Sequence, residues 1–333
     1  MHIVFFEIMP GEREHLESSI PAGHAVAFSE EKLTERSAAQ FADADIISVF
    51  VNSQITRSII DGLPNLKLIT TRSMGYDHID IAYAKEKGIR VSNVTTYAAH
   101  PVAEFAFALL LAVARNIYPA YDQLREGTSY DIRKLQGVTL SGKTIGVLGT
   151  GRIGKTVCGI ARGFGMNVLA FDIHPDEQLA ATTPLTYAPL DDVLAKADVL
   201  SVHMPYTPET HHIINAEAFG RMKKGVILIN TARGELIDTH ALVAAITSGT
   251  VAGAGLDVLE GERALKEETE ALTARLPDVD YRLLAANHFL IDHPTVLITP
   301  HIAFSTDEAM LEISRVTAQS ISNFIAGTEQ AYL

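Results

Sequence analysis

Three ionisable residues in the second half of the chain follow strand-like apolar runs, where parallel α/β sheets bind their ligands. Arg233 follows GVILINTA, and its planar guanidinium could grip a substrate carboxylate and a carbonyl oxygen through two hydrogen bonds. Glu262 comes five residues after Asp257 in LDVLEGE, and His301 follows a proline in TVLITPHIAFST. Each residue also has an ordinary interpretation: Arg233 as a surface arginine, Glu262 as part of a solvated acidic run, and His301 as one of 13 histidines without a special role. Position in the sequence alone does not decide between a functional and an ordinary role.

A glycine pattern opens the same half of the chain. Gly149, Gly151 and Gly154 form G-x-G-x-x-G between a strand-like run and a helical segment. The first two permit a tight turn and close approach to a pyrophosphate, the third permits close helix–strand packing, and the helix N-terminus would offer N–H groups to the phosphates. Asp172 ends the next strand-like run, where a carboxylate can accept hydrogen bonds from ribose hydroxyls and repel a 2′-phosphate. The pattern predicts that the site binds NAD rather than NADP. The alternatives are an ordinary glycine-rich loop for the three glycines and an exposed aspartate in the turn before Pro175 for Asp172.

Composition argues against several classes of partner. The 27 Lys and Arg residues are outnumbered by 40 Asp and Glu residues, and a formal charge of −13 repels nucleic acid and anionic lipid. The single cysteine, Cys158, lies in an apolar helical pattern, so we expect a packed thiol, no disulfide within the chain, no metal site and a reducing cytoplasm. The apolar run at 105–114 has 10 residues, short of the roughly 20 needed to span a bilayer, and the N-terminus is typical of a first strand rather than a signal peptide.

Strand-like runs alternate with helical patterns along the chain, which indicates parallel strands joined by crossover helices. The pattern predicts a helical stretch at 30–41 and a long apolar helix at 99–117, followed by an arm or linker at 118–137 that shows little periodicity. The first set of expected strands is 2–8, 24–29, 45–51, 66–71 and 89–94. The second set is 144–149, 167–172, 198–204, 225–231, 253–258 and 295–300. We therefore expect an α/β protein with two Rossmann-like, doubly wound parallel-sheet domains.

The order GTGRIG, NTARG, LDVLEGE and TPHIAFST resembles the D-isomer-specific 2-hydroxyacid dehydrogenase family over nearly the whole chain. Within the family the chain is most similar to the D-lactate dehydrogenase branch, in the Phe and Thr of HIAFST and in the long segment 263–294. The resemblance implies that Arg233, Glu262 and His301 are catalytic. Arg233 would bind the substrate carboxylate and polarise the carbonyl, and His301 would donate the proton. Glu262 would orient the imidazole and favour its protonated form.

The resemblance also implies a discontinuous, flavodoxin-like substrate-binding domain, residues 1–98 and 303–333, into which an NAD-binding Rossmann domain, residues 99–302, is inserted. In the loop RSMGYDHID at 72–80, backbone N–H groups would hold the substrate carboxylate, with a glycine for the unusual backbone geometry; a plain strand-to-helix turn is the alternative. The substrate-binding residues implied are Met74, Gly75, Tyr97, Arg233 and Phe304; packing at the hinge is the alternative for Tyr97, and packing in the core for Phe304. The NAD-binding residues implied are Gly149, Gly151, Arg152, Ile153, Gly154, Asp172, His203, Pro205, Thr231, Ala232 and Asp257.

These inferences predict an NAD-dependent D-2-hydroxyacid dehydrogenase, first of all a D-lactate dehydrogenase that converts pyruvate and NADH to D-lactate and NAD. A larger or different 2-oxo acid, such as phenylpyruvate, hydroxypyruvate or glyoxylate, is the alternative, because Asn52 stands where lactate-specific relatives often have an aromatic residue. A non-catalytic NAD(H)-sensing protein is a third possibility. The resemblance also implies a homodimer, because relatives associate through the region of the 99–117 helix and the following arm; packing of these segments inside one subunit is the alternative.

Overall fold

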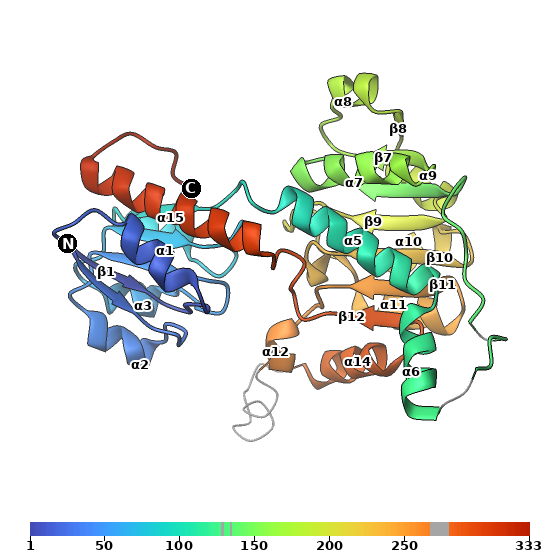
Figure 1. The fold of residues 1–333 in the computed structure, drawn as a ribbon, viewed down its shortest axis with the longest axis horizontal. Coiled ribbons are helices and arrows are strands. Elements are labelled where there is room, and N and C mark those ends of the chain that lie inside the picture. Colours follow the sequence, from blue (N-terminus) through green and yellow to red (C-terminus); the bar gives the residue numbers. More distant parts are fainter. Residues whose placement is uncertain (128–129, 134, 267–279) are drawn as a thin grey trace. The chain divides into compact units, whose positions relative to one another are not determined.

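The computed structural model describes residues 1–127, 130–133, 135–266 and 280–333. The chain divides into two compact units, Met1–Ala98 together with Ser305–Leu333, and Ala99–Phe304. Each unit is built around one parallel sheet with helices on both faces (Figure 1). The predicted fold class, two α/β domains with parallel sheets, is confirmed.

The sheet of the first unit has five strands in the order β2-β1-β3-β4-β5, which is the flavodoxin-like order. All five expected strands are present, and each is shorter than the apolar run that predicted it. The strands are β1 (His2–Phe5), β2 (Ala25–Phe28), β3 (Ile46–Val49), β4 (Leu68–Thr71) and β5 (Arg90–Asn93). The helices are α1 (Glu12–Ser19), α2 (Glu35–Ala38), the 3-10 turn η1 (Ala39–Phe41), α3 (Arg57–Asp61), α4 (Ile81–Glu86) and α15 (Asp307–Ala326).

Successive residues of the first-unit strands pack into different cores, as the two faces of a pleated strand require. Ile3 and Phe5 pack with Leu16 of α1 and Ile321 of α15. Val4 packs on the opposite face, with residues from α3 and α4. The C-terminal helix α15 therefore completes one face of a sheet whose strands all lie near the N-terminus.

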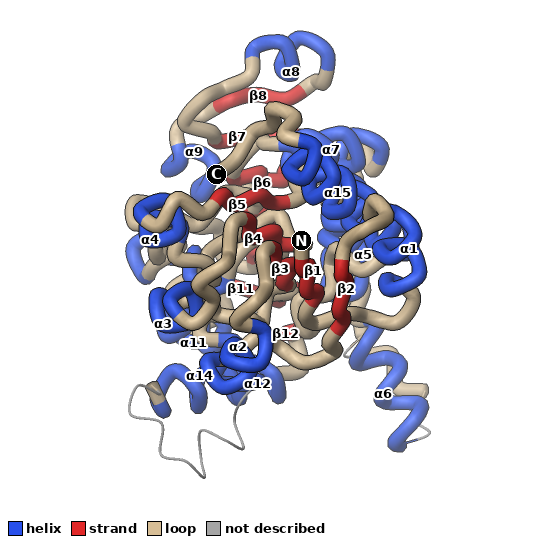
Figure 2. Tube along the Cα trace, turned by 90° about the vertical axis from the view of Figure 1, so that its left-hand side faces the viewer, coloured by secondary structure: helices blue, strands red, loops and turns tan. Residues whose placement is uncertain are grey.

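The sheet of the second unit has seven strands in the order β12-β11-β10-β9-β6-β7-β8. This is the doubly wound Rossmann order with one additional strand, β12, at the edge. Figure 2 shows the strands of both units in red with helices around them. The strands are β6 (Thr144–Leu148), β7 (Asn167–Phe171), β8 (Leu185–Tyr187), β9 (Val199–Val202), β10 (Val226–Asn230), β11 (Val251–Leu256) and β12 (Val296–Ile298).

Helices α5 and α7 pack together on one face of this sheet. The approach of α5 to β11 is close, because an added Cβ on Gly253 or Gly255 would lie under 3 Å from a side chain of α5. Helices α9, α10, α11 and α14 lie on the other face. The helices are α5 (Ala99–Ala114), α6 (Ile117–Gly127), α7 (Arg152–Gly163), α8 (Glu177–Thr182), α9 (Leu190–Lys196), α10 (Ala216–Arg221), η2 (Gly234–Leu236), α11 (Thr239–Thr247), α12 (Glu262–Lys266) and α14 (Tyr281–Asp292).

Four details differ from the expectations. Strand β8 was not predicted; its three residues, Leu-Thr-Tyr, form no apolar run. The helix expected at 99–117 ends at Ala114, and Asn116 adopts a left-handed φ of 50°. The first part of the expected arm is helical, as α6. The helical stretch expected at 30–41 begins only at Glu35, after Thr34 caps it.

Within the described ranges, no single helix is long and apolar enough to cross a membrane. Helices α5 and α6 reach that length and apolar composition only as a pair, and they are bent by 59° at the break between them.

Candidate active site

The glycine loop joins β6 to α7 and meets the steric demands of a dinucleotide-binding turn. Gly149 has a φ of +89°, and an added Cβ there would lie 2.8 Å from the carbonyl oxygen of His203. An added Cβ on Gly154 would lie 1.9 Å from the carbonyl oxygen of Gly149, so a side chain would push α7 away from the turn. At Gly151, in contrast, a Cβ would have no described atom within 4 Å, which leaves this backbone open to a ligand.

The helix N-terminus that follows is also suited to an anion. Gly151 is the N-cap residue of α7, and among the described atoms no side chain caps the helix there. Arg152 and Ile153, both expected at the NAD site, are its first two residues. The first N–H groups of such a helix are available to phosphate oxygens.

Asp172 follows β7 and lies against the glycine loop. Its Oδ2 accepts hydrogen bonds from the Thr150 N–H at 2.7 Å and the Thr150 hydroxyl at 3.0 Å, and its Oδ1 accepts from the His174 N–H at 2.9 Å. Burial acts to raise the pKa of Asp172, but these N–H donors lower it overall. The charged carboxylate is therefore held beside the turn, as recognition of a ribose requires.

Two buried polar atoms at the ends of β9 and β10 have no hydrogen-bond partner in the described chain, Nδ1 of His203 and Oγ1 of Thr231. The other ring nitrogen of His203 is 2.7 Å from the Ser201 hydroxyl. Burial lowers the pKa of His203 to about 3, so the ring is neutral near pH 7. Unpaired buried polar atoms are rare unless a ligand or water meets them. With the open backbone at Gly151, they fit a bound dinucleotide.

Arg233 is positioned by a short turn after β10. Asn230, fully buried at the end of that strand, donates to the Arg233 carbonyl oxygen at 2.8 Å and accepts from the Ala232 N–H at 3.0 Å. The guanidinium donates to the Ala232 carbonyl oxygen at 2.7 Å. An added Cβ on Gly234 would lie 2.0 Å from the carbonyl carbon of Leu259, so this turn packs directly on the backbone that leads to Glu262.

Glu262 and His301 are brought together by β11 and β12. Oε1 of Glu262 lies 2.9 Å from Nδ1 of His301, and both side chains are partly exposed, 30% and 25% respectively. His301, three residues after the end of β12, has a left-handed φ of 57°, which turns the chain there. The pairing leaves Nε2 as the ring atom that can exchange a proton with a ligand. The structure thus joins two of the three predicted catalytic residues through a hydrogen bond.

Asp257 holds the turn that carries His301. Its carboxylate accepts hydrogen bonds from the Thr299 hydroxyl at 2.5 Å, the Ile302 N–H at 2.9 Å and the Ala303 N–H at 2.8 Å. Burial raises the pKa of Asp257, although these hydrogen bonds act in the opposite direction. This geometry supports the His301 turn, and the expected contact of Asp257 with NAD stays a prediction.

The loop expected to bind the substrate carboxylate follows β4 in the first unit. The Met74 N–H donates to the Tyr97 hydroxyl at 3.3 Å, and the Met74 carbonyl accepts from Asn93 at 2.7 Å. Gly75 is not among the described glycines with positive φ, so the unusual backbone geometry expected of it is not a left-handed one. Its carbonyl accepts from the Ser73 hydroxyl at 2.7 Å, and such side-chain hydrogen bonds shape the loop instead.

Sequence reasoning missed a buried charged network under this loop. Arg72 is fully buried and donates to the carbonyl oxygens of Phe6 and Glu7 at 2.7 and 2.8 Å, and its Nε lies 3.3 Å from Glu12. The Glu7 carboxylate accepts from the N–H groups of residues 50, 52 and 53 at 2.9–3.1 Å. Asn52 is thereby fixed through its backbone. The available signal was a glutamate that interrupts the first apolar run.

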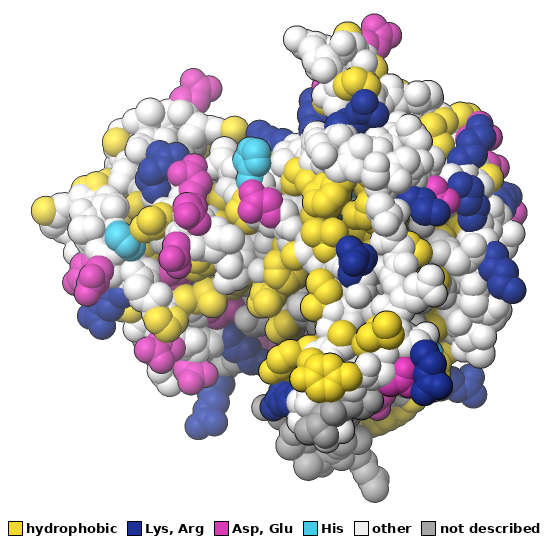
Figure 3. Space-filling model, turned by 45° about the vertical axis from the view of Figure 1, so that its right-hand side comes forward, with side chains coloured by type: hydrophobic (Ala, Val, Ile, Leu, Met, Phe, Trp, Pro, Cys, Tyr) yellow, Lys and Arg dark blue, Asp and Glu magenta, His cyan; other side chains and the backbone are white. Residues whose placement is uncertain are grey.

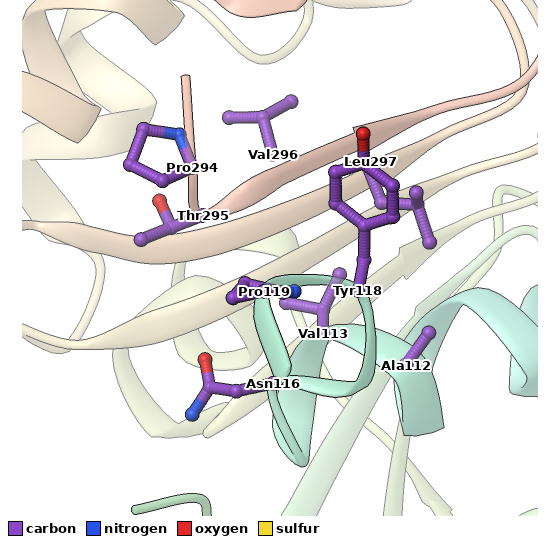
Figure 4. A pocket seen from close by; sticks show the side chains of 9 residues that line it. All are labelled: Ala112, Val113, Asn116, Tyr118, Pro119, Pro294, Thr295, Val296 and Leu297. Atoms are coloured by element: carbon purple, nitrogen blue, oxygen red, sulfur yellow. The ribbon is translucent and has the colours of Figure 1, made fainter. Parts of the chain in front are cut away.

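One surface pocket lies outside the predicted site. It is lined by the end of α5, the start of α6 and residues 294–297 around β12, and the Tyr118 side chain extends toward Leu297 (Figure 4). None of its lining residues belongs to the glycine loop or to the pair formed by Glu262 and His301.

Residues 107–303 match the family model described as the NAD binding domain of D-isomer specific 2-hydroxyacid dehydrogenases. The chain is 39% identical over 328 residues to "2-hydroxyacid dehydrogenase homolog 1" of Schizosaccharomyces pombe, covering 97% of this chain and 96% of that protein. It is 37% identical over 307 residues to the D-lactate dehydrogenase of Escherichia coli, covering 92% and 91%.

Solved structures of similar proteins cover the same length. The D-lactate dehydrogenase from Aquifex aeolicus, complexed with NAD and lactic acid, matches with a TM-score of 0.84 and 35% identity over 98% of this chain and 96% of that one. The pyruvate reductase of Chlamydomonas reinhardtii matches with a TM-score of 0.88 and 34% identity over 99% and 97%. The chain therefore belongs to the D-isomer-specific 2-hydroxyacid dehydrogenases, near their D-lactate dehydrogenase branch, and is an NAD-dependent oxidoreductase.

Proposed function

We propose that this enzyme is a D-lactate dehydrogenase, which reduces pyruvate with NADH and a proton to D-lactate and NAD. The observation that carries the proposal is the 2.9 Å pair of Glu262 and His301 in the same unit as the glycine loop. A histidine oriented by a carboxylate is suited to give a proton to a carbonyl oxygen. Relatives named D-lactate dehydrogenase from Escherichia coli and Aquifex aeolicus support pyruvate as the substrate.

The proposed mechanism divides the chemistry among three side chains. NADH, when bound, supplies the hydride to C2 of the 2-oxo acid. Arg233 binds the substrate carboxylate and polarises the carbonyl, through the bidentate geometry of its guanidinium. His301 donates the proton from Nε2 to the carbonyl oxygen, while Glu262 holds Nδ1 and stabilises the imidazolium. In lactate oxidation His301 acts as the base.

We also propose roles for residues of the substrate pocket. The N–H groups of Met74 and Gly75 bind the substrate carboxylate, and a carboxylate there would replace the long 3.3 Å bond from Met74 to Tyr97. Phe304 contacts the methyl group of pyruvate. The unit Met1–Ala98 with Ser305–Leu333 is then the substrate-binding domain, and Ala99–Phe304 the NAD-binding domain.

A different 2-oxo acid is the second candidate substrate. Relatives include a glyoxylate reductase from Thermofilum pendens, 37% identical over 289 residues, and a D-2-hydroxyisocaproate dehydrogenase, whose structure is 30% identical. Asn52, at a position tied to Glu7, is the residue we propose as the determinant of substrate size.

The first experiment follows the oxidation of NADH with pyruvate and with glyoxylate, hydroxypyruvate and phenylpyruvate, each repeated with NADPH. We expect rapid turnover of pyruvate with NADH. An assay specific for D-lactate should detect the product, and an assay specific for L-lactate should not. His301→Gln should lose most turnover and keep NADH binding, because the ring supplies only the proton. Preference for a bulkier acid would favour the second candidate, and unchanged turnover in His301→Gln would remove the proposed acid.

We propose that the enzyme is a homodimer formed through α5 and α6. Hydrophobic side chains gather on the surface of the second unit in this region (Figure 3). On α6 they recur at helical spacing and form one exposed face: Ile117, Tyr118, Tyr121 and Leu124. Analytical ultracentrifugation should give a dimer for the wild type and a monomer for Tyr121→Glu. Leu311→Glu, which changes an exposed leucine of α15, should remain dimeric; a dimeric Tyr121→Glu would refute this interface.

A further inference from the structure

Glu260 lies two residues before Glu262 and is bonded to other parts of the second unit. One of its carboxylate oxygens is 2.7 Å from Nε2 of His212. The other accepts from the Thr239 hydroxyl at 2.8 Å and from the Thr239 N–H at 3.3 Å, at the start of α11. The side chain is 16% exposed, so these bonds form with little competition from water.

The backbone around Glu260 is held as well. Asn287 of α14 is 1% exposed and donates from Nδ2 to the Glu260 carbonyl oxygen at 2.9 Å. One turn earlier on α14, a side-chain carbon of Leu283 lies 2.8 Å from where a Cβ on Gly261 would be. On the remaining side, the Arg233 turn packs on Leu259 through Gly234. Residues 259–261 are therefore fixed on three sides, immediately before Glu262.

The partner of Glu260 is itself constrained. His212 has a left-handed φ of 50°, and its N–H donates to the Glu235 carbonyl oxygen at 2.9 Å. Its ring stacks on His211 with the centroids 3.9 Å apart. The ionisable groups around this cluster are His211, His212, Arg233, Glu235, Glu260 and Glu262.

We propose that Glu260 is a positioning residue for the reaction, which holds the Glu262 carboxylate in register with Nδ1 of His301. The bond between them is 2.9 Å, and N–H···O bonds weaken beyond about 3.2 Å, so a loop displacement well under 1 Å would weaken it. Fixed geometry of this kind is what makes an acid–base pair effective. The inference rests on the proposed function, because proton transfer by His301 creates the demand for this geometry.

A charged carboxylate is needed because Glu260 faces three donors, one from His212 and two from Thr239. In Glu260→Gln one oxygen becomes an NH2 group, which cannot accept. Toward Thr239 this group would face two donors, and toward His212 it would find an acceptor only after the ring moved its proton from Nε2 to Nδ1; the negative charge is lost in both cases. The weaker ties would let residues 259–261 shift. His212→Gln retains a side-chain amide donor of comparable reach, whereas His212→Ala retains none.

The experiment measures kcat, KM and the pH profile of 2-oxo acid reduction for the wild type, Glu260→Gln, His212→Ala and His212→Gln. It also measures the NMR signal of the His301 Nδ1 proton, assigned by its loss in His301→Gln. We expect Glu260→Gln and His212→Ala to lower kcat about tenfold with little change in KM or NADH affinity. The alkaline limb of the profile should move to lower pH, and the proton signal should move upfield as its bond to Glu262 weakens. His212→Gln should recover most of kcat.

Asp198→Asn is the matched control, since that carboxylate also ties a loop, through Thr144 and Lys223, but before β9 at the opposite end of a strand. It should lose stability without moving the pH profile or the signal. An active wild type with unchanged kcat, profile and signal in Glu260→Gln would overturn the inference alone. A wild type that reduces no 2-oxo acid would overturn the proposed function, while the signal would still show whether Glu260 holds the pair.

Discussion

Gly151 and Gly154 lie three residues apart, at the N-cap and in the first turn of α7, yet the same substitution by alanine should affect them in different ways. At Gly154 the added Cβ would lie 1.9 Å from the Gly149 carbonyl oxygen, whereas ordinary contact begins at 3.4 Å. The added Cβ and the Gly149 oxygen must therefore separate by about 1.5 Å, which requires the packed backbone of α7 or of the loop to move. Overpacking destabilises by about 1–3 kcal/mol, and this clash belongs at the upper end. A loss of about 3 kcal/mol lowers the melting temperature of a domain of this size by roughly 6–12 °C.

At Gly151 the Cβ would meet no described atom within 4 Å, so Gly151→Ala should unfold nearly like the wild type. Alanine is a poorer N-cap than glycine, which accounts for less than about 1 kcal/mol. NADH affinity should nevertheless fall at least about tenfold, because the methyl group would occupy the space of the pyrophosphate.

Thermal unfolding and NADH fluorescence titration separate these effects. Gly159→Ala, in the same helix and also without a described neighbour within 4 Å, is the control. It should stabilise by about 0.5–1 kcal/mol and leave NADH binding unchanged. The steric reasoning fails if Gly154→Ala is as stable as the wild type. The assignment of the pyrophosphate site fails if Gly151→Ala binds NADH normally.

Two further predictions concern residues at the carboxyl ends of β9 and β10 in the same sheet. Because burial lowers the pKa of His203 to about 3, the unfolded chain binds a proton near pH 6.5 that the folded chain does not, so stability rises with pH between these values. Urea unfolding should show about 2 kcal/mol lost to this group between pH 8 and 5, a loss that is absent in His203→Asn. An equal pH dependence of unfolding in both proteins would contradict this prediction. Asn230→Ala removes both hydrogen bonds that Asn230 makes to the Arg233 turn. We therefore expect kcat/KM for pyruvate to fall about tenfold. Unchanged kinetics would show that Asn230 does not position Arg233.

Local patterns were sufficient wherever a feature depends on neighbours in the chain. Eleven of the twelve described strands coincide with apolar runs in the sequence, and the run is continuously apolar where a strand is buried on both faces, as most of β10 shows. The steric role of Gly154 was expressed directly in the glycine spacing. Strand β8 was missed because Leu-Thr-Tyr, between Pro184 and Pro189, forms no apolar run, whereas β12, which is equally short and also at a sheet edge, lies within the apolar run TVLITP. The break between α5 and α6 depends on the left-handed backbone of Asn116, which apolar periodicity does not encode.

The arrangement of the active site could not be predicted from local patterns alone. Residue types at strand ends nominated Glu262 and His301, but they are 39 positions apart, and only the neighbouring positions of β11 and β12 bring them within hydrogen-bond distance. The residues that hold them, such as Glu260 and Asn287, resemble ordinary surface or helix positions in the sequence. The sequence by itself determined which groups could do chemistry and which strands end beside them, since both are local properties. Only the tertiary structure decided which buried donors and acceptors hold those groups in place, because that depends on contacts between distant segments.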